Sequence, residues 1–241
     1  MPKIPNWVFI LLALLHFSAA RIDMMDIDAT QYAEISREMM QSGDYLHLYD
    51  RGLDYLDKPP MLFWVSSLSM KVFGVNDFGY KFPSILFAIW AMYAVYRLGR
   101  LLYDDATGRM AALILGCCQG MFLMTNDVRT DTILMSCVIT AIWMIKECEA
   151  KRRWQYVLGG TAAIAAGMMT KGPIALMVPM FCFGSDWVLK RDWKKIFSPY
   201  HIIDVILIGI FLIPMSIGLY QQFDMHPEKS VNGLTHVSGL R

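Results

Sequence analysis

Long apolar runs separated by short polar segments make up most of the chain. A first run covers residues 4–20, and six more follow at 82–102, 109–124, 132–148, 155–169, 174–189 and 201–220. A helix needs about 20 mostly apolar residues to cross the hydrocarbon core of a bilayer, and a helix satisfies all its backbone groups internally. The pattern therefore predicts an all-α, polytopic transmembrane helical bundle of about seven spans.

The first run has a second interpretation. It lies between Lys3 and Arg21, and Ser18-Ala19-Ala20 is similar to the cleavage site of a secretory signal peptide. Because further apolar spans follow, we favour an uncleaved first span whose N-terminus faces the cytoplasm.

One polar stretch, residues 26–60, interrupts this pattern and carries many of the acids. It contains Asp28-Ala29-Thr30-Gln31, which has the spacing of a helical capping box. Small and apolar residues then recur at helical spacing, at Ala29, Tyr32, Ala33, Ser36 and Met40. We expect a short amphipathic helix that lies flat in the membrane interface and ends at Ser42-Gly43. Residues 44–57 are expected to be irregular, with a turn at Arg51-Gly52.

Residues 61–73 are apolar but too short to cross a membrane, and they include Lys71. Pro59-Pro60 comes directly before them, where proline favours the start of a helix. We expect a second interfacial or re-entrant helix here.

The basic residues support this topology. They gather in three clusters, Arg97/Arg100/Arg109, Lys151/Arg152/Arg153 and Lys190/Arg191/Lys194/Lys195. If residues 61–73 do not cross, all three clusters face the cytoplasm, as the positive-inside rule requires. The polar segments 26–60, 126–131 and 170–173 then share the outer face. The expected organisation is one module with a first span (4–20), an outer catalytic loop (21–80), the remaining bundle (82–220) and an outer tail (221–241).

Composition agrees with a membrane protein. Hydrophobic residues make up 56% of the chain and charged residues 18%, and the mean hydropathy is +0.39. A net charge of +1 provides no general attraction for nucleic acid, so none is expected as a partner. The five cysteines lie in or beside apolar runs without metal-ligand spacing, and no metal site is proposed.

Acids and cations on one outer face suit group transfer from a phosphate-linked donor. A carboxylate can take the proton of an attacking hydroxyl, while Lys and Arg neutralise the departing phosphate. A helix that starts after Pro59 adds backbone donors for the same anion. The chain has no glycine-rich nucleotide-binding pattern, which favours a lipid-linked donor over a soluble nucleotide sugar.

Several motifs occur together in a characteristic order. They are Asp28-Ala-Thr-Gln-Tyr-Ala-Glu-Ile, Asp57-Lys58-Pro59-Pro60, Phe73-Gly74 through Lys81-Phe82-Pro83-Ser84, Arg129-Thr130-Asp131 and Thr170-Lys171-Gly172-Pro173. In this the chain resembles the bacterial polyprenyl-phosphate-dependent glycosyltransferases of the protein O-mannosyltransferase and lipid A aminoarabinose transferase group. The resemblance covers almost the whole chain. It implies the GT-C membrane fold, a polyprenyl-phosphate-linked sugar donor, a lipid or protein acceptor, and a site facing the periplasm across the bacterial inner membrane.

The resemblance also implies roles for individual residues. Asp28 matches the catalytic carboxylate of the first outer loop, and Lys58 matches the lysine that contacts the lipid phosphate. Arg129 and Asp131 match polar residues of the second outer loop. The chain has Ala29 and Gln31 where the family commonly has an acid and an arginine, which leaves Asp26 as a stand-in for the missing acid.

The candidate site then falls into two sets. The candidate catalytic residues are Asp28, Asp131 and Asp26, and the candidate donor-binding residues are Lys58, Arg129, Lys171, Tyr32 and Asp57. No cofactor is assigned, and a divalent metal at the carboxylates is left open as an alternative.

Structural explanations exist for several of these residues. Asp28 and Asp131 can act as helix N-caps, and Lys58 and Lys171 can snorkel towards lipid headgroups. A transporter and a non-catalytic membrane scaffold are the alternative functions. Transport is less favoured because the spans carry their charges at the ends rather than at the midplane. Family members continue beyond the length of this chain, so a fragment of a longer enzyme is expected.

Overall fold

The computed structural model describes residues 4–18, 20, 22–24, 26–196 and 200–224. Most of the expected outer tail, residues 225–241, therefore lies outside the described residues, as does part of the sequence similar to a cleavage site. The described helices are α1 (Asn6–Ser18), α2 (Ile27–Ser42), α3 (Met61–Phe73), α4 (Asp77–Leu102), α5 (Asp105–Cys117), α6 (Gln119–Asn126), α7 (Thr130–Lys151), α8 (Trp154–Lys171), α9 (Ile174–Leu189), α10 (Trp193–Ile196) and α11 (Tyr200–Leu219), followed by a π-helical turn (Tyr220–Asp224). Strands β1 (Tyr49–Asp50) and β2 (Leu53–Asp54) form an antiparallel hairpin.

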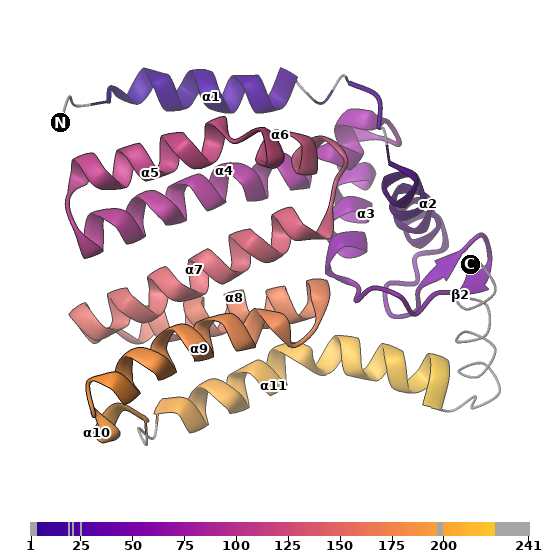
Figure 1. The fold of residues 1–241 in the computed structure, drawn as a ribbon. Helices are drawn as coiled ribbons and strands as arrows, with labels where there is room; N and C mark the ends of the chain where they lie inside the picture. The colour runs from indigo at the N-terminus through magenta and orange to yellow at the C-terminus, as the bar shows by residue number, and fades with distance from the viewer. Residues whose placement is uncertain (1–3, 19, 21, 25, 197–199, 225–241) are drawn as a thin grey trace.

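The long helices form one bundle, and α2, α3 and the hairpin lie across one of its ends (Figure 1). Each of the seven expected spans contains a helix. By length and composition, two described stretches can cross a membrane alone: α4 and the stretch His201–Phe223. The pair α5 and α6 provides up to one more, while α1, α3 and α9 are shorter apolar helices. The total of about seven crossings remains a prediction.

The expectation of one continuous helix over 109–124 is wrong. The chain leaves helical geometry at Cys118, and α5 and α6 are bent by 54° relative to each other. The bend turns the second half of this segment towards the end of the bundle that carries α2 (Figure 1).

Helix α3 matches the prediction for residues 61–73. It begins after Pro60, ends at Gly74, and lies across the ends of the long helices rather than alongside them (Figure 1). This orientation agrees with a helix that does not cross the membrane, so the charge assignment based on it is consistent with the fold.

Helix α2 differs from its prediction at its start. The residue before the helix is Asp26, whose backbone is extended and whose side chain makes no capping hydrogen bond. Asp28 lies inside the first turn, so the expected capping box at Asp28 is wrong. The end is as predicted, with Gly43 in the left-handed region at φ 72°.

The apolar face of α2 packs on protein. Tyr32, Ile35 and Met39 are buried in one core together with Leu62 and Phe63 of α3. Ala33 and Met40, expected on this face, are only partly buried against the same core. Other segments complete this core, with Leu48, Tyr55, Met70, Tyr80, Val128, Ile133 and Cys137. The polar side of α2 is therefore held outwards on a shared core at the end of the bundle.

The hairpin is fastened to the end of α11. Arg51 and Gly52 form its turn, both at positive φ (54° and 75°), which confirms the turn expected there. The Gln222 side chain accepts a hydrogen bond from the Leu48 N–H (3.1 Å) and donates to the Leu48 carbonyl (2.8 Å) and to Asp54 (2.8 Å). The first outer loop is thus tied to a residue more than 160 positions later in the chain.

The three basic clusters lie at the opposite end of the bundle, around the turns that join α4 to α5, α7 to α8 and α9 to α10 (Figure 1). There the buried Glu147 pairs with Arg97 (2.9 Å) and Lys151 (2.5 Å) and accepts a hydrogen bond from Trp143. The two ends therefore differ in charge as the sequence predicts.

Candidate active site

Two segments about 100 residues apart meet at the Arg129 side chain. Its Nη2 lies 2.6 Å from Oδ2 of Asp26, and its Nη1 lies 3.8 Å from Oδ2 of Asp28. Asp26 and Asp28 flank the first residue of α2, whereas Arg129 directly precedes α7. The structure thus brings together three residues that the sequence proposes for the site. The two acids differ in exposure, because the Asp26 side chain is 25% exposed and the Asp28 side chain 55%.

Arg129 owes its position to an unusual turn. Val128, directly before it, has φ 52°, in the left-handed region that β-branched residues rarely adopt. Its side chain is fully buried in the core beneath α2. The Arg129 N–H donates to the Met124 carbonyl (3.0 Å), which closes the turn after α6. Burial and this hydrogen bond together hold a strained backbone beside the site.

A second ion pair lies near the first in sequence. Nζ of Lys171 is 2.6 Å from Oδ1 of Asp131, and both side chains are about 40% exposed. Asp131 lies in the first turn of α7 and Arg129 is the residue before the helix, so the alternative interpretation of Asp131 as an N-cap is wrong. Lys171 is the last residue of α8, and Gly172 ends that helix at φ 75°.

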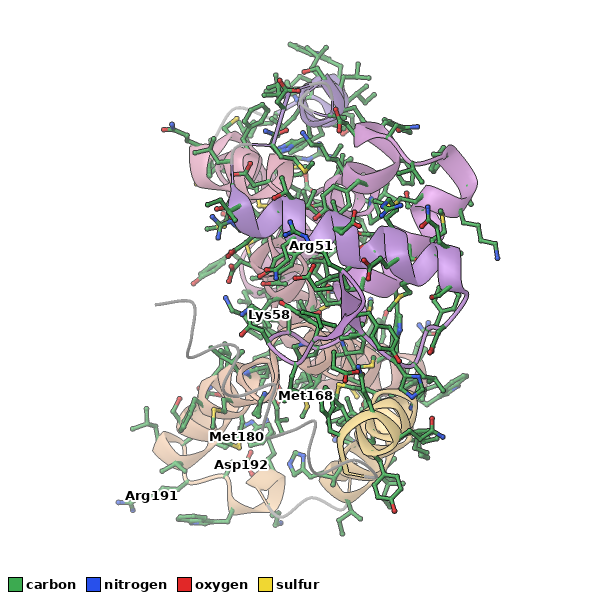
Figure 2. The ribbon with its side chains drawn as sticks, turned by 90° about the vertical axis from the view of Figure 1, so that its right-hand side faces the viewer. Arg51, Lys58, Met168, Met180, Arg191 and Asp192 are labelled. Carbon is green, nitrogen blue, oxygen red and sulfur yellow. The ribbon has the colours of Figure 1, made fainter. Side chains whose placement is uncertain are left out.

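Lys58 forms the third ion pair, with its neighbour Asp57 (2.7 Å). Tyr55 points at the same carboxylate and donates a hydrogen bond to it (3.4 Å). Figure 2 looks onto the end of the bundle that α2 covers and labels Lys58 and Arg51 there. Because α3 starts at Met61, its N-terminal N–H groups lie a few residues from Lys58 and add positive potential to the same corner.

Tyr32 lies beneath these charges. It is buried, and its ring makes an edge contact with Phe63 at 5.8 Å between centroids. Burial, and then the carboxylates of Asp28 and Asp57, raise the pKa of Tyr32 to about 12. Tyr32 is therefore a neutral hydroxyl at neutral pH.

An apolar groove opens beside the second ion pair. It has a volume of about 410 Å³ and runs between the α5–α6 bend, α7 and α9. Leu115, Met121, Leu134 and Val138 contribute to its walls, and Asp131 is its acidic member. The apolar walls of the groove therefore continue up to the Lys171–Asp131 ion pair.

The charges are arranged around cations rather than around a common metal position. Asp26 and Asp28 both face Arg129, and Asp131 and Asp57 each face a lysine. A divalent metal needs several oxygen ligands directed at one centre. Across the described residues, no three His, Cys, Asp or Glu side chains meet in this way.

Two buried residues of α4 also reach the site. Tyr80 and Lys81 contact the segments that carry Asp28 and Arg129. Both lie in one of the family motifs, but the sequence predicts no role for them. The available signal was a lysine directly before the apolar run 82–102, because a charged residue within or beside a membrane helix usually has a specific partner.

Solved structures share this fold. ArnT from Cupriavidus metallidurans in the apo state matches with a TM-score of 0.81 and 20% identity, over 96% of this chain and 44% of that one. The same protein bound to undecaprenyl phosphate matches with a TM-score of 0.77 and 21% identity, over 93% and 42%. The fold is therefore a helical membrane bundle of the GT-C type.

The sequence comparisons specify the family. The family model for dolichyl-phosphate-mannose-protein mannosyltransferase matches residues 57–217, and the chain belongs to this family. This match includes Lys58, Arg129 and Lys171 but begins after Asp28.

Two curated relatives are undecaprenyl phosphate-alpha-4-amino-4-deoxy-L-arabinose arabinosyl transferases. That of Sodalis glossinidius is 34% identical over 178 residues, which is 70% of this chain and 32% of the relative. That of Edwardsiella ictaluri is 30% identical over 194 residues, which is 76% of this chain and 34% of the relative. The chain spans about a third of the length of these relatives.

Proposed function

We propose that the chain belongs to a membrane glycosyltransferase that moves a sugar from a polyprenyl-phosphate donor to an acceptor hydroxyl at the periplasmic face of the bacterial inner membrane. The arrangement of Arg129 against Asp26 and Asp28 is the observation that carries this proposal. It brings two carboxylates and a guanidinium together, and these are group types that can act as a general base and as a phosphate-binding cation in transfer from a phosphate. The names of the relatives support the donor class.

Asp28 is assigned as the general base. Its contact with Arg129 is the longer of the two, and its side chain is the more exposed. It can therefore meet an acceptor hydroxyl while Asp26 holds the guanidinium. Asp28 also lies in the first turn of α2, at the end of the helix where an acceptor can approach from outside the bundle.

We propose that the sugar is transferred in a single displacement at its anomeric carbon. The acceptor oxygen attacks the anomeric carbon of the sugar and passes its proton to the Asp28 carboxylate. The bond from the anomeric carbon to the phosphate oxygen breaks, and the polyprenyl phosphate leaves with the electron pair. Lys58, Arg129 and Lys171 offset the charge that develops on this phosphate, with Asp131 and Asp57 orienting two of these cations.

The groove beside Asp131 suits the lipid part of the donor. Most residues of its walls are apolar, and the groove reaches the Lys171–Asp131 ion pair. A polyprenyl chain in this groove would keep its hydrocarbon out of water with the phosphate close to the cations.

Topology gives the first test. Single cysteines that replace Ser42 and Asn76, in a chain whose native cysteines are removed, should both react with an impermeant thiol reagent in intact spheroplasts. Ser42 is the last residue of α2, and Asn76 lies between α3 and α4, at the end that we place outside. A reaction at Ser42 with protection at Asn76 would mean that α3 crosses the membrane and would contradict the proposed orientation.

The donor clamp gives the second test. Lys58→Ala should weaken binding of undecaprenyl phosphate by roughly 10- to 150-fold, because a charge-assisted contact with phosphate contributes about 1.5–3 kcal/mol. Lys58→Arg should retain part of the affinity. The measurement is titration of the purified protein in detergent, with Lys71→Ala, an exposed lysine of α3, as the matched control. Equal affinity in Lys58→Ala and the parent would assign the phosphate to Arg129 or Lys171 instead.

A further inference from the structure

Two consecutive residues of α4 reach both segments of the site. The Tyr80 hydroxyl donates a hydrogen bond to the carbonyl of Ala29 (2.8 Å). The Lys81 ammonium donates to the side-chain oxygen of Asn126 (2.9 Å) and to the carbonyl of Ile22. One turn of α4 therefore contacts the chain before α2, the first turn of α2 and the end of α6.

These contacts bracket the proposed catalytic groups. Ile22 and Ala29 lie on either side of Asp26 and Asp28 along the chain. Asn126 is the last residue of α6, three positions before Arg129. The ammonium of Lys81 is thus a bridge between the acidic segment and the arginine segment, at a distance from the acids and arginine themselves.

Both side chains are buried too deeply to meet a substrate. Tyr80 is 2% exposed and Lys81 is fully buried. The two hydrogen-bond acceptors of Lys81 are neutral oxygens, one from the backbone and one from an amide. Burying an ammonium raises the free energy of the folded state even when it is hydrogen-bonded. If packing alone mattered, an uncharged side chain of similar length, such as methionine, would therefore be more favourable at this position. The carboxylates of Asp77, Asp127 and Asp23 offset part of this cost. A hydrocarbon side chain could fill the same space, but it could not join two separate segments by hydrogen bonds as Lys81 does.

We propose that Tyr80 and Lys81 are positioning residues that set the separation between the Asp26–Asp28 segment and Arg129. The effect of this positioning on catalysis rests on the proposed function, whereas its effect on the distance between the two segments does not. A displacement of about 1 Å in such a site can lower the reaction rate about 100-fold. Two hydrogen-bonding residues on one rigid helix can therefore affect the rate by fixing the distance between the two segments.

The geometric part is tested without any activity. Nitroxide labels on cysteines replacing Ile27 and Met124, two exposed side chains, in the full protein with native cysteines removed, report the distance between the two segments. We expect one narrow interspin distance in the parent, and a broadened and longer distribution in Lys81→Met. Lys71→Met removes an exposed lysine on α3 and should leave the distribution unchanged.

A second pair of variants covers the case in which Lys81→Met fails to fold. Asn126→Leu removes the acceptor for Lys81 and should broaden the distribution, whereas Asn126→Asp keeps an acceptor oxygen and should restore the narrow one. A parental distribution in folded Asn126→Leu would overturn the proposal, as would a parental distribution in folded Lys81→Met.

The catalytic part uses the same variants in a transfer assay. We expect Lys81→Met to lower kcat about 100-fold with a smaller change in the donor KM. Tyr80→Phe should lower kcat less, and Tyr103→Phe, which alters an exposed tyrosine, should have no effect. A rise in KM at parental kcat would overturn a positioning role. If the parent transfers no sugar, the proposed function fails, while the distance measurement still decides whether the bridge sets the separation.

Discussion

Replacing Asp28 with Asn is expected to lower the rate of sugar transfer about 100- to 10,000-fold, the usual contribution of a positioned general base. Asparagine has nearly the same shape but cannot accept the proton of the acceptor hydroxyl. Asp28 makes the longer contact with Arg129 and is not the N-cap residue of α2, so this change should leave folding and donor binding close to those of the parent.

Asp26→Asn is the matched comparison because it removes the same charge two residues earlier. Its carboxylate makes the shorter contact with Arg129, at 2.6 Å, so we expect looser placement of the guanidinium and a smaller loss of transfer. Both variants are measured in the full-length protein, with transfer and Tm recorded together. Normal transfer by Asp28→Asn with loss in Asp26→Asn would move the base to Asp26. Normal transfer by both would point to Asp131.

Arg129→Met is expected to lower transfer about 100- to 1,000-fold, similar to the loss of one preorganised group that stabilises charge in a transition state. It removes the cation that two carboxylates share and leaves Asp26 and Asp28 as neighbouring like charges. Donor binding should weaken as well, which distinguishes this variant from Asp28→Asn.

Arg129→Lys provides a graded form of the same test. A lysine keeps the charge but lacks the planar fork that can face two carboxylates at once, so partial activity is expected. Arg51→Met, in the exposed turn of the hairpin, is the control for loss of an arginine at the same end of the bundle (Figure 2). Parental transfer and binding in Arg129→Met would remove Arg129 from the mechanism.

The parts of the fold set by local pattern were predictable. The short apolar run after Pro59-Pro60 gives α3 with its predicted limits, and Arg51-Gly52 gives the hairpin turn. Charge bias likewise sorted the loops onto two ends, because it depends on composition rather than on contacts. Each of these features requires information from a few neighbouring residues only.

The pairings within the site were not predictable in the same way. Periodicity shows which face of a helix is buried but not which distant residue it meets, so neither Arg129 with Asp26 nor Lys171 with Asp131 follows from the sequence. The helix starts were also misassigned at Asp28 and Asp131, because a capping pattern competes with the path the chain takes before the helix. No proline near Cys118 indicates the bend between α5 and α6.

The left-handed turn at Val128 links the site to the folding of the whole end of the bundle. A β-branched residue at φ 52° is unfavourable by about 1–2 kcal/mol, and burial among side chains from α2, α3 and α7 compensates for it. Without that packing, Val128 would relax to negative φ and turn Arg129 away from the two carboxylates. The position of the guanidinium therefore depends on the core that α2, α3 and α7 form around Val128. A local opening of this core would displace Arg129 together with the elements that pack there, so the geometry of the candidate site and the local stability of this end of the bundle are coupled.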